Sequence, residues 1–524
     1  MSRTVLVLVL VRWLVVVALG VGCGAGGGGG GGAAPGAGGA APAAPAAPPA
    51  GPPATVAVTT PAAGLSGDIA IDLTVSHPSS LPVDVEVEGS ADGGATYFPT
   101  TPAAGAAGPS GLASAPAPAG AVHRYVWASA ADLGATDQRA VRLRVTPVGP
   151  ARGAPAQTGV FDVLNSSLPG AVLARYPYVQ RVDATSALIL WKTTVPQQGA
   201  VEYGPTPALG SVAVEGAPGT AHRVEIAGLA PGSTAHYRVL GDGARLGPVE
   251  TFRVPDPAAA RVRFAVVGDS GNGGRTQRRV ADLMRAADPD FYLHTGDVIY
   301  PAGEERHYDE RFFDPYRENA RRAPFFPSLG NHDIIAYLGD PYLEAFEVPR
   351  TNPARSERYY AFEWGPARFL ALDTSLGFII PGSPQHLWLI DELNRPGPWT
   401  WTFAFHHHPP YSSSPEFTAG SNLLIRHLVS PLYEQAGVDV VFTGHAHVYE
   451  RTRPRRDFAG AGPGVVYIVT GGGGAGTHPA GTSSFTAVSV EAHHYVLVEI
   501  DGRTLTATAI RDDGSVLDAF TIAK

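Results

Sequence analysis

Five short apolar runs in this chain each end at Asp, Asn, His or Tyr, and this repetition constrains the fold more than any other feature. The runs and the residues that follow them are 264–267 before Gly268-Asp269-Ser270-Gly271, 291–293 before Gly296-Asp297-Val298-Ile299-Tyr300, 325–329 before Gly330-Asn331-His332-Asp333, 401–405 before His406-His407-His408-Pro409-Pro410, and 438–443 before Gly444-His445-Ala446-His447. A short apolar run bounded in this way is typical of a buried strand. Open α/β folds place their chemistry beyond the carboxyl ends of their strands. The pattern therefore predicts one shared site, whereas a chance distribution would scatter these residue types over all loops.

The residue types at these strand ends indicate metal binding. Asp297 has two carboxylate oxygens and could bridge two cations, while His445 and His447 lie two apart on an extended segment and so point to the same side. Mixed oxygen and nitrogen ligands without cysteine suit Fe, Mn or Zn better than a metal that prefers sulfur. A two-metal centre is the natural interpretation.

The same residues resemble a known family. The relevant motifs are Gly268-Asp269-x-Gly271, Gly296-Asp297-x-x-Tyr300, Gly330-Asn331-His332-Asp333, His407 before Pro409-Pro410, and Gly444-His445-x-His447-x-Tyr449-Glu450-Arg451. In this order they resemble the motifs of the purple acid phosphatases, a group of the calcineurin-like metallophosphoesterases, over residues 172–524. The resemblance implies two metal sites that share one ligand. Their ligands would be Asp269, Asp297, Tyr300 and His447 for one metal, and Asp297, Asn331, His407 and His445 for the other.

The resemblance also implies cofactors and an activity. Fe(III) with a second divalent metal (Fe, Zn or Mn) would hydrolyse phosphate monoesters, as in an acid phosphatase, and the expected partner is a small-molecule phosphate ester. Candidate catalytic residues are His332, which could donate to the phosphate or the leaving oxygen, His408, which could face the substrate, and Asp333. Where the family often has further histidines, this chain has Glu416 and Phe417. The leaving-group acid therefore stays open, and two alternatives remain: a phosphodiesterase or nucleotidase with the same metals, and a non-enzymatic surface adhesion protein.

The start of the chain has the pattern of an exported protein. Residues 1–23 combine Arg3 and Arg12 with an apolar stretch that ends in small residues, as in an export signal. Cys23, the one cysteine, resembles a bacterial lipoprotein acceptor, so membrane attachment through lipidated Cys23 and simple cleavage both remain open. The expected location is outside the cytoplasm, as a secreted, periplasmic or cell-surface protein. Residues 24–54 are nearly all Gly, Ala and Pro, and we expect them to form a disordered tether.

Two all-β modules are predicted to follow the tether. Alternating apolar residues in 69–75, 83–87 and 141–145 predict half-buried strands, and residues 55–165 resemble an immunoglobulin-like β-sandwich with a loose loop at 102–118. Residues 171–255 resemble a fibronectin type III domain, on the basis of Leu229-Ala-Pro-Gly-Ser233 and Tyr237. We expect Trp191 and Tyr237 to be core residues rather than ligand contacts.

The last part, residues 260–524, alternates strands with helices. Helices are predicted after the Asp269 loop, from Ser383-Pro384 onward, and over 423–435 before Gly437, and a hairpin is predicted near the end of the chain. This pattern argues for an α/β layered domain, and the resemblance specifies an α/β/β/α sandwich. Histidines without motif context are expected to be surface or core residues: His222, His236, His307, His386, His427, His478, His493 and His494.

The charge of the chain argues against a nucleic-acid partner. Lys plus Arg number 38 against 47 for Asp plus Glu, which gives a net charge of −9. No basic patch for nucleic acid or polybasic stretch for a membrane surface stands out. We therefore expect a phosphate substrate to be drawn by the metals locally.

Overall fold

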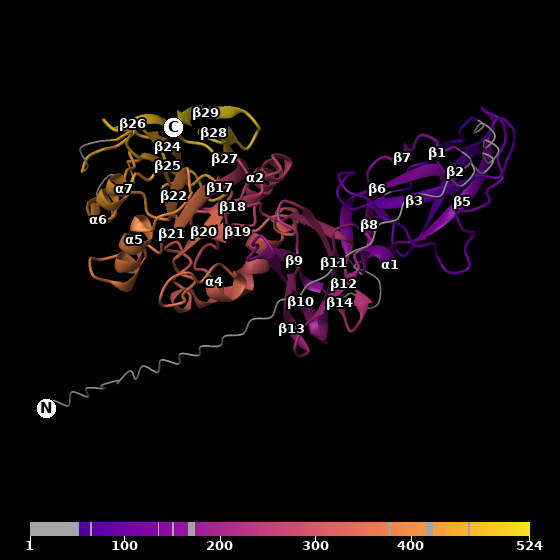
Figure 1. Ribbon diagram of the computed structural model, residues 1–524, viewed down its shortest axis with the longest axis horizontal. Coiled ribbons are helices and arrows are strands. Elements are labelled where there is room, and N and C mark those ends of the chain that lie inside the picture. Colours follow the sequence, from indigo (N-terminus) through magenta and orange to yellow (C-terminus); the bar gives the residue numbers. More distant parts are fainter. Residues whose placement is uncertain are drawn as a thin grey trace, which may run out of the picture. The chain divides into compact units, whose positions relative to one another are not determined.

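The computed structural model describes residues 52–62, 65–134, 136–148, 151–165, 173–375, 379–415, 423–458 and 462–524 (Figure 1). The predicted export signal and all of the tether up to residue 51 lie outside the described residues. Three consecutive parts of the described chain have their own sheets: two all-β modules and a C-terminal α/β domain. No helix in the described ranges combines the length and apolar character needed to span a bilayer.

The first module consists of two antiparallel sheets that share one core. One sheet contains β1 (Thr55–Val58), β2 (Asp68–Ser76) and β5 (Ala121–Ala128), and the other contains β3 (Asp84–Ser90), β4 (Phe98–Pro99), β6 (Asp137–Val148), β7 (Ala156–Gln157) and β8 (Phe161–Leu164). A short helix, α1 (Ser129–Leu133), follows β5. Alternate residues of β2, β3 and β6 are buried around Trp127, as expected for strands with one face on a core. The three predicted strands are confirmed.

The segment predicted to be a loose loop is ordered by backbone contacts. Within 102–118, Leu112 forms a bridge with Val83, in which each residue donates its N–H to the carbonyl of the other, and the Val85 N–H donates to the carbonyl of Pro109 at 2.8 Å. The segment is a loop, as predicted, since residues 102–118 contain no helix or strand, but it is not loose. Glycine and proline made the composition look unstructured, but these contacts with the edge of β3 satisfy the backbone.

The second module also has two sheets. They are formed by β9 (Leu173–Gln180), β10 (Ser186–Gln197) and β13 (Gly219–Ala227), and by β11 (Gly199–Gly204), β12 (Ser211–Val214), β14 (Thr234–Gly241), β15 (Ala244–Arg245) and β16 (Glu250–Arg253). Trp191 and Tyr237 are buried in the core between them, as predicted. Trp191 stacks on His222 with ring centroids 4.7 Å apart.

The C-terminal domain is built on two sheets that pack face to face. The first has the strand order β19 (Phe325–Pro327), β18 (Phe291–His294), β17 (Arg261–Val267), β27 (His494–Asp501), β28 (Thr504–Arg511) and β29 (Val516–Ala523). The second has the order β20 (Tyr360–Trp364), β21 (Ala367–Ala371), β22 (Trp401–His406), β23 (Val440–Thr443), β25 (Val466–Thr470), β24 (Tyr449–Thr452) and β26 (Thr486–Val490). Phe264 of the first sheet lies edge-on to Phe369 and Phe403 of the second, with ring centroids 5.2 and 5.4 Å apart.

Helices cover both outer faces, so the layers are α/β/β/α. Helix α2 (Arg275–Ala286) buries Val280 and Met284 in the core of the first sheet, whereas α5 (Pro384–Asn394), α6 (Leu423–Leu428) and α7 (Ser430–Ala436) pack on the second sheet (Figure 1). Shorter helical segments lie in the connections after β18 and β19: η2 (Glu305–His307), η3 (Asp309–Phe313), α3 (Arg317–Ala320), η4 (Tyr337–Gly339) and α4 (Asp340–Ala345).

Two of the predicted helix signals are confirmed and one boundary is wrong. Ser383 caps α5 by accepting the N–H of His386, and Gly437 ends α7 in the left-handed conformation. The single helix predicted over 423–435 is two helices, with a break at Val429. Pro431 explains the break, because proline has no N–H to continue the hydrogen bonds of α6 and its ring would clash with the preceding turn.

The second β module is joined to the C-terminal domain by buried polar contacts. Arg321 follows α3, is 3% exposed, and forms an ion pair of 2.8 Å with Glu250 of β16, which is 7% exposed. Arg321 also pairs with Glu318, and its carbonyl accepts the hydroxyl of Tyr237 at 2.7 Å. Burial raises the pKa of Glu250 to about 7, against the pull of the nearby arginines. A buried guanidinium that loses one carboxylate is poorly compensated.

We predict that Glu250→Ala lowers the thermal stability of the full chain, because it leaves part of the Arg321 charge unpaired. The expected cost is about 3 kcal/mol, measured as a shift of the unfolding midpoint. Asp72→Ala, which breaks the exposed pair of Asp72 with Arg124, is the matched control and should leave the midpoint unchanged. Equal midpoints for the two variants would contradict a stabilising role for the buried pair.

Candidate metal centre

The five predicted strand ends meet at one place. β17, β18 and β19 are parallel neighbours in the first sheet, and β22 and β23 are parallel neighbours in the second. Their carboxyl ends deliver all seven predicted metal ligands: Asp269, Asp297, Tyr300, Asn331, His407, His445 and His447. Parallel strands end at the same edge of a sheet, so residues far apart in the chain become neighbours in space.

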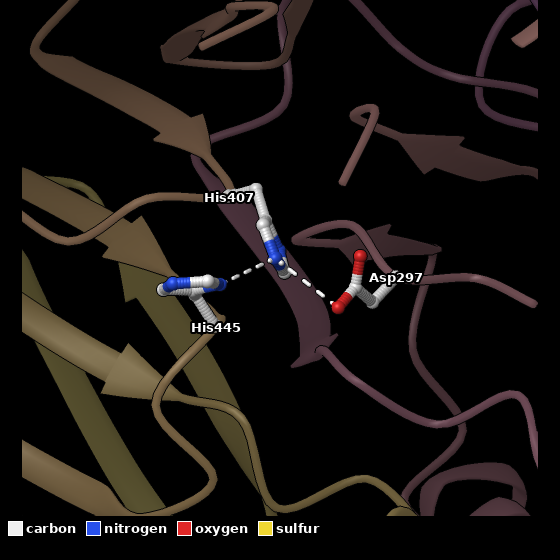
Figure 2. A group of neighbouring side chains, drawn as sticks. All are labelled: Asp297, His407 and His445. Atoms are coloured by element: carbon white, nitrogen blue, oxygen red, sulfur yellow. Dashed lines mark hydrogen bonds and ion pairs between the residues drawn. The ribbon is translucent and has the colours of Figure 1, made fainter. Parts of the chain in front are cut away.

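Asp297 lies at the centre of this group. Its Oδ2 is 3.3 Å from His407 Nε2, and His407 Nε2 is 3.2 Å from His445 Nδ1 (Figure 2). One ligand atom from each of these three residues lies within 4.8 Å of the other two. The amide oxygen of Asn331 is 2.9 Å from the same His407 nitrogen. These four residues are the set predicted for one metal.

Tyr300 lies at the centre of the second predicted set of metal ligands. Its hydroxyl is 3.2 Å from Asp269 Oδ1, 3.1 Å from Asp297 Oδ2 and 3.1 Å from His447 Nε2. His447 Nε2 is also 3.4 Å from Asp269 Oδ1. Both sets therefore include Oδ2 of Asp297, which is the position that a bridging carboxylate requires.

The backbone is strained at three of these ligands. Asp269, Asp297 and His445 have φ values of 56°, 51° and 69°, in the left-handed region that side chains other than glycine rarely adopt. Each such residue costs of the order of 1 kcal/mol, so surrounding contacts must hold it in place. The N–H of His445 donates to both carboxylate oxygens of Asp269, at 3.0 and 2.9 Å, and the N–H of His332 donates to Asp297 Oδ1 at 2.8 Å.

The tautomers of the two histidines leave their inner nitrogens free to bind a cation. His407 Nδ1 lies 2.9 Å from the carbonyl of Thr295, and His447 Nδ1 lies 2.5 Å from the carbonyl of Gly476. A carbonyl only accepts, so each Nδ1 carries a hydrogen, and in the neutral ring each Nε2 has the lone pair that a cation needs. This outer hydrogen bond to a carbonyl is the usual support for a metal-binding histidine.

The electrostatics of the site require positive charge. Asp269 and Asp297 are 0% and 2% exposed, and no Lys or Arg forms an ion pair with either in the described part of the chain. Burial and these two carboxylates raise the pKa of Tyr300 well above its usual value. Burial opposes protonation of His407, but Asp297 and Asp269 outweigh it and raise the pKa of His407 to about 9. Burial beside His407 lowers the pKa of His445 to about 3.

These observations test whether the residues fit a pair of metal ions, and they do. Carboxylate oxygens, a phenol oxygen, an amide oxygen and imidazole nitrogens converge on two points, and in the described part of the chain no Lys or Arg pairs with the two carboxylates. At the 2.9 to 3.4 Å that separate these atoms, two lone pairs repel one another unless a proton or a cation lies between them. Without sulfur, the donor set suits Fe, Mn or Zn.

Asp333 lies behind the site rather than in it. Its side chain is fully buried, and its oxygens accept the N–H groups of Gly330, Val298 and Ile299 at 2.9, 3.1 and 3.1 Å. These contacts tie the loop after β19 to the loop after β18. The catalytic role predicted for Asp333 is therefore replaced by a positioning role, because its carboxylate is occupied by backbone amides.

The other two predicted catalytic residues border the site. The side chain of His332 is 33% exposed, and its ring lies 4.6 Å from the ring of Tyr300. His408 is half-buried, with its ring 4.7 Å from that of His445 and its Nδ1 2.9 Å from the hydroxyl of Thr374. Glu416 and Phe417, which raised the question of the leaving-group acid, lie outside the described residues.

His478 also belongs to the site, although the sequence placed it among residues without a role. Its ring stacks on that of His447, with centroids 4.0 Å apart and an angle of 7° between planes. Its Nδ1 accepts the N–H of His447 at 3.0 Å. No motif surrounds His478, and only the return of the chain after β25 brings it to the metal ligands.

Comparison with known proteins agrees with this geometry. Residues 262–449 match the model of the calcineurin-like phosphoesterases, and they contain all seven predicted ligands. They form a calcineurin-like phosphoesterase domain. Its relatives in sequence include purple acid phosphatases, such as purple acid phosphatase 22 of Arabidopsis thaliana, at 29% identity over 49% of this chain and 59% of the relative. The chain thus spans less than two thirds of that relative's length.

Two further matches extend the comparison. An uncharacterized protein of Mycobacterium tuberculosis is 27% identical over 56% of this chain and 68% of its own length. The structure of a purple acid phosphatase from yellow lupin seeds covers 90% of this chain and 96% of its own with a TM-score of 0.61 and 18% identity. At that identity the match shows the fold alone. Because the match covers 90% of this chain, the similarity in fold extends beyond residues 262–449.

We predict that Asp297→Asn empties both metal positions, because one carboxylate serves both ligand sets. Metal analysis of the purified full chain should fall from about two ions per chain to near zero. His332→Ala is the matched control, because its ring borders the site without belonging to either set, and it should keep its metal. Retention of two ions by the Asp297→Asn chain would show that the ligand sets are assigned wrongly.

Proposed function

We propose that this chain hydrolyses phosphate monoesters with a dinuclear metal centre, as an acid phosphatase. The observation that carries this proposal is the shared Oδ2 of Asp297 between two convergent ligand sets. Sequence similarity of the phosphoesterase domain to purple acid phosphatases supports it independently. A surface adhesion protein would have no need of buried, strained carboxylates that have no Lys or Arg partner in the described part of the chain.

The chain's own residues supply binding and orientation around the metals. When bound, two cations supply Lewis acidity and an activated water nucleophile below neutral pH. His332 holds its Nδ1 against the carbonyl of Pro301 at 2.5 Å, so when protonated its Nε2 can donate to an oxygen of the phosphate. Thr374 orients the ring of His408 on the other side of His445. Asp333 holds the loops of Asp297 and Asn331 together through hydrogen bonds from their backbone N–H groups.

The preference for monoesters is tested by comparing two related substrates. The metal-loaded full chain is assayed on 4-nitrophenyl phosphate and bis(4-nitrophenyl) phosphate. Both substrates release 4-nitrophenolate, so the ratio of the two rates does not reflect a difference in leaving group. We expect the monoester to react faster, with an optimum below pH 7. Faster hydrolysis of the diester would favour the phosphodiesterase alternative. Loss of both rates in Asp297→Asn is the control for contaminating enzymes.

The identity of the first metal forms a second part of the proposal. The phenol oxygen of Tyr300 approaches Asp269 and Asp297 in a buried site, and burial with these charges holds its pKa well above the ordinary value. A strongly Lewis-acidic, trivalent cation is best able to bind the phenolate, because it can offset the free energy needed to deprotonate this tyrosine. We therefore assign Fe(III) to the set that contains Tyr300, and a divalent Fe, Zn or Mn ion to the other set.

We predict that the metal-loaded chain has a visible phenolate-to-iron charge-transfer band, which Tyr300→Phe removes. Zinc, with its filled d shell, has no such band. The measurement is an absorption spectrum together with metal analysis, and His332→Ala should keep the colour because its ring only packs against Tyr300. A colourless, iron-free and fully active chain would overturn the assignment of iron.

A further inference from the structure

Three of the five residues that follow the Gly330–Asp333 motif have apolar side chains that are open to solvent. Ile335, Tyr337 and Leu338 are 61%, 81% and 61% exposed, and we name these three residues the apolar lip. In the described part of the chain, no other run of four residues has three large hydrophobic side chains this exposed. Single exposed apolar residues need no explanation, but a contiguous group of them marks a surface that binds something.

The backbone of the apolar lip is strained. Tyr337 and Leu338 have φ values of 49° and 57°, so two consecutive residues other than glycine lie in the left-handed region. This conformation costs about 1 to 2 kcal/mol per residue. Strain of this kind persists only where surrounding contacts over-determine it, and it is concentrated at functional positions.

Contacts from three loops of the metal centre hold the apolar lip in place. The N–H of Ile335 donates to the carbonyl of His332 at 3.4 Å, and the N–H of Ala336 donates to the carbonyl of Ala302, two residues beyond Tyr300, at 3.0 Å. Arg358 donates to the carbonyl of Leu338 and to Asp373 Oδ2, the latter at 3.2 Å. Asp373 in turn precedes Thr374, the partner of His408.

Buried residues that anchor the apolar lip alternate with the exposed side chains that form its surface. Ala336 and Gly339 are buried against the domain and Ile334 packs on its core, while the side chains of Ile335, Tyr337 and Leu338 remain in solvent. The protein thus braces the main chain of this segment, while within the described residues its apolar side chains stay largely uncovered. They are therefore available to bury an apolar group from outside the chain.

We propose that the apolar lip binds the organic group of the phosphate ester and makes the enzyme selective for apolar alkyl or aryl monoesters. This inference rests on the proposed function. A phosphoryl group at the metals must extend its ester group outward, and the lip begins within one turn of His332, which borders that position. Ile335, Tyr337 and Leu338 are therefore specificity-determining residues that contact the leaving group and not the reacting atoms.

The test uses the metal-loaded full chain with hexyl phosphate and ethyl phosphate, whose leaving alcohols have the same reactivity. We expect hexyl phosphate to have a kcat/KM about tenfold higher, since apolar contacts of a few methylene groups give discrimination of this order. The variant Tyr337→Asn/Leu338→Asn should reduce the ratio of the two kcat/KM values to about one. The main change should be a higher KM for hexyl phosphate, because the lip binds the hexyl group equally in the ground and transition states. Asn is chosen because it tolerates positive φ.

The control variant is Val516→Asn, which replaces another exposed apolar residue, 61% exposed, on the edge strand β29. It should leave the hexyl to ethyl ratio unchanged. A wild type that hydrolyses both esters equally, or a lip variant that keeps the preference, overturns the role of the lip and leaves the proposed function intact. A lip variant with unchanged kinetics but a changed oligomeric state would also overturn this role and would indicate a protein-binding surface instead.

A second measurement separates this inference from the activity. Hexylphosphonate and ethylphosphonate cannot be hydrolysed, and their affinities for the metal-loaded chain can be measured by calorimetry. Tighter binding of hexylphosphonate, lost in the lip variant and kept in Val516→Asn, supports the lip. Equal affinities overturn it. If the chain hydrolyses neither these esters nor 4-nitrophenyl phosphate, the proposed function fails, and the affinities for the two phosphonates still test the lip.

Discussion

The burial of two carboxylates without a Lys or Arg partner is the constraint on which the C-terminal domain depends. Asp269 and Asp297 are almost completely buried, and removing such charges from water costs several kcal/mol each. Within the described residues, histidines and backbone N–H groups are what the protein offers them in return. Cations between the two ligand sets would complete the compensation, which is why fold stability and metal binding should be coupled in this domain.

The space around these carboxylates is as restricted as their charge. A side chain at Gly330 would collide with the backbone N and the Oδ1 of Asp297, and one at Gly444 would collide with Oδ2 of Asp269. The glycines of the motifs are thus needed for close approach of the loops to the ligands. Asp333 completes this arrangement from behind, because it joins three backbone amides of two loops with one carboxylate.

The second β module takes part in the same structural unit as the phosphoesterase domain. Its core residues and those of the first sheet belong to one continuous cluster, and Tyr237, its central tyrosine, donates its hydroxyl to the carbonyl of Arg321. Arg175 of β9 pairs with Asp309 at 2.5 Å, in the connection that follows the Tyr300 loop. The module therefore supports the segment between β18 and β19, which begins with the loop that carries Asp297 and Tyr300.

The sequence alone determined the strand ends and the seven candidate ligands, because apolar runs that stop at Asp, Asn, His and Tyr are local patterns that the tertiary structure keeps. It also determined the caps at Ser383 and Gly437. Tertiary structure decided the rest. The carboxylate of Asp333 accepts backbone amides of another loop, and His478 contacts His447 although 30 residues separate them in the chain. Residues 102–118 are held by backbone contacts with β3. The apolar lip likewise looks like core in the sequence, since exposure is a property of how loops are held and not of which residues they contain.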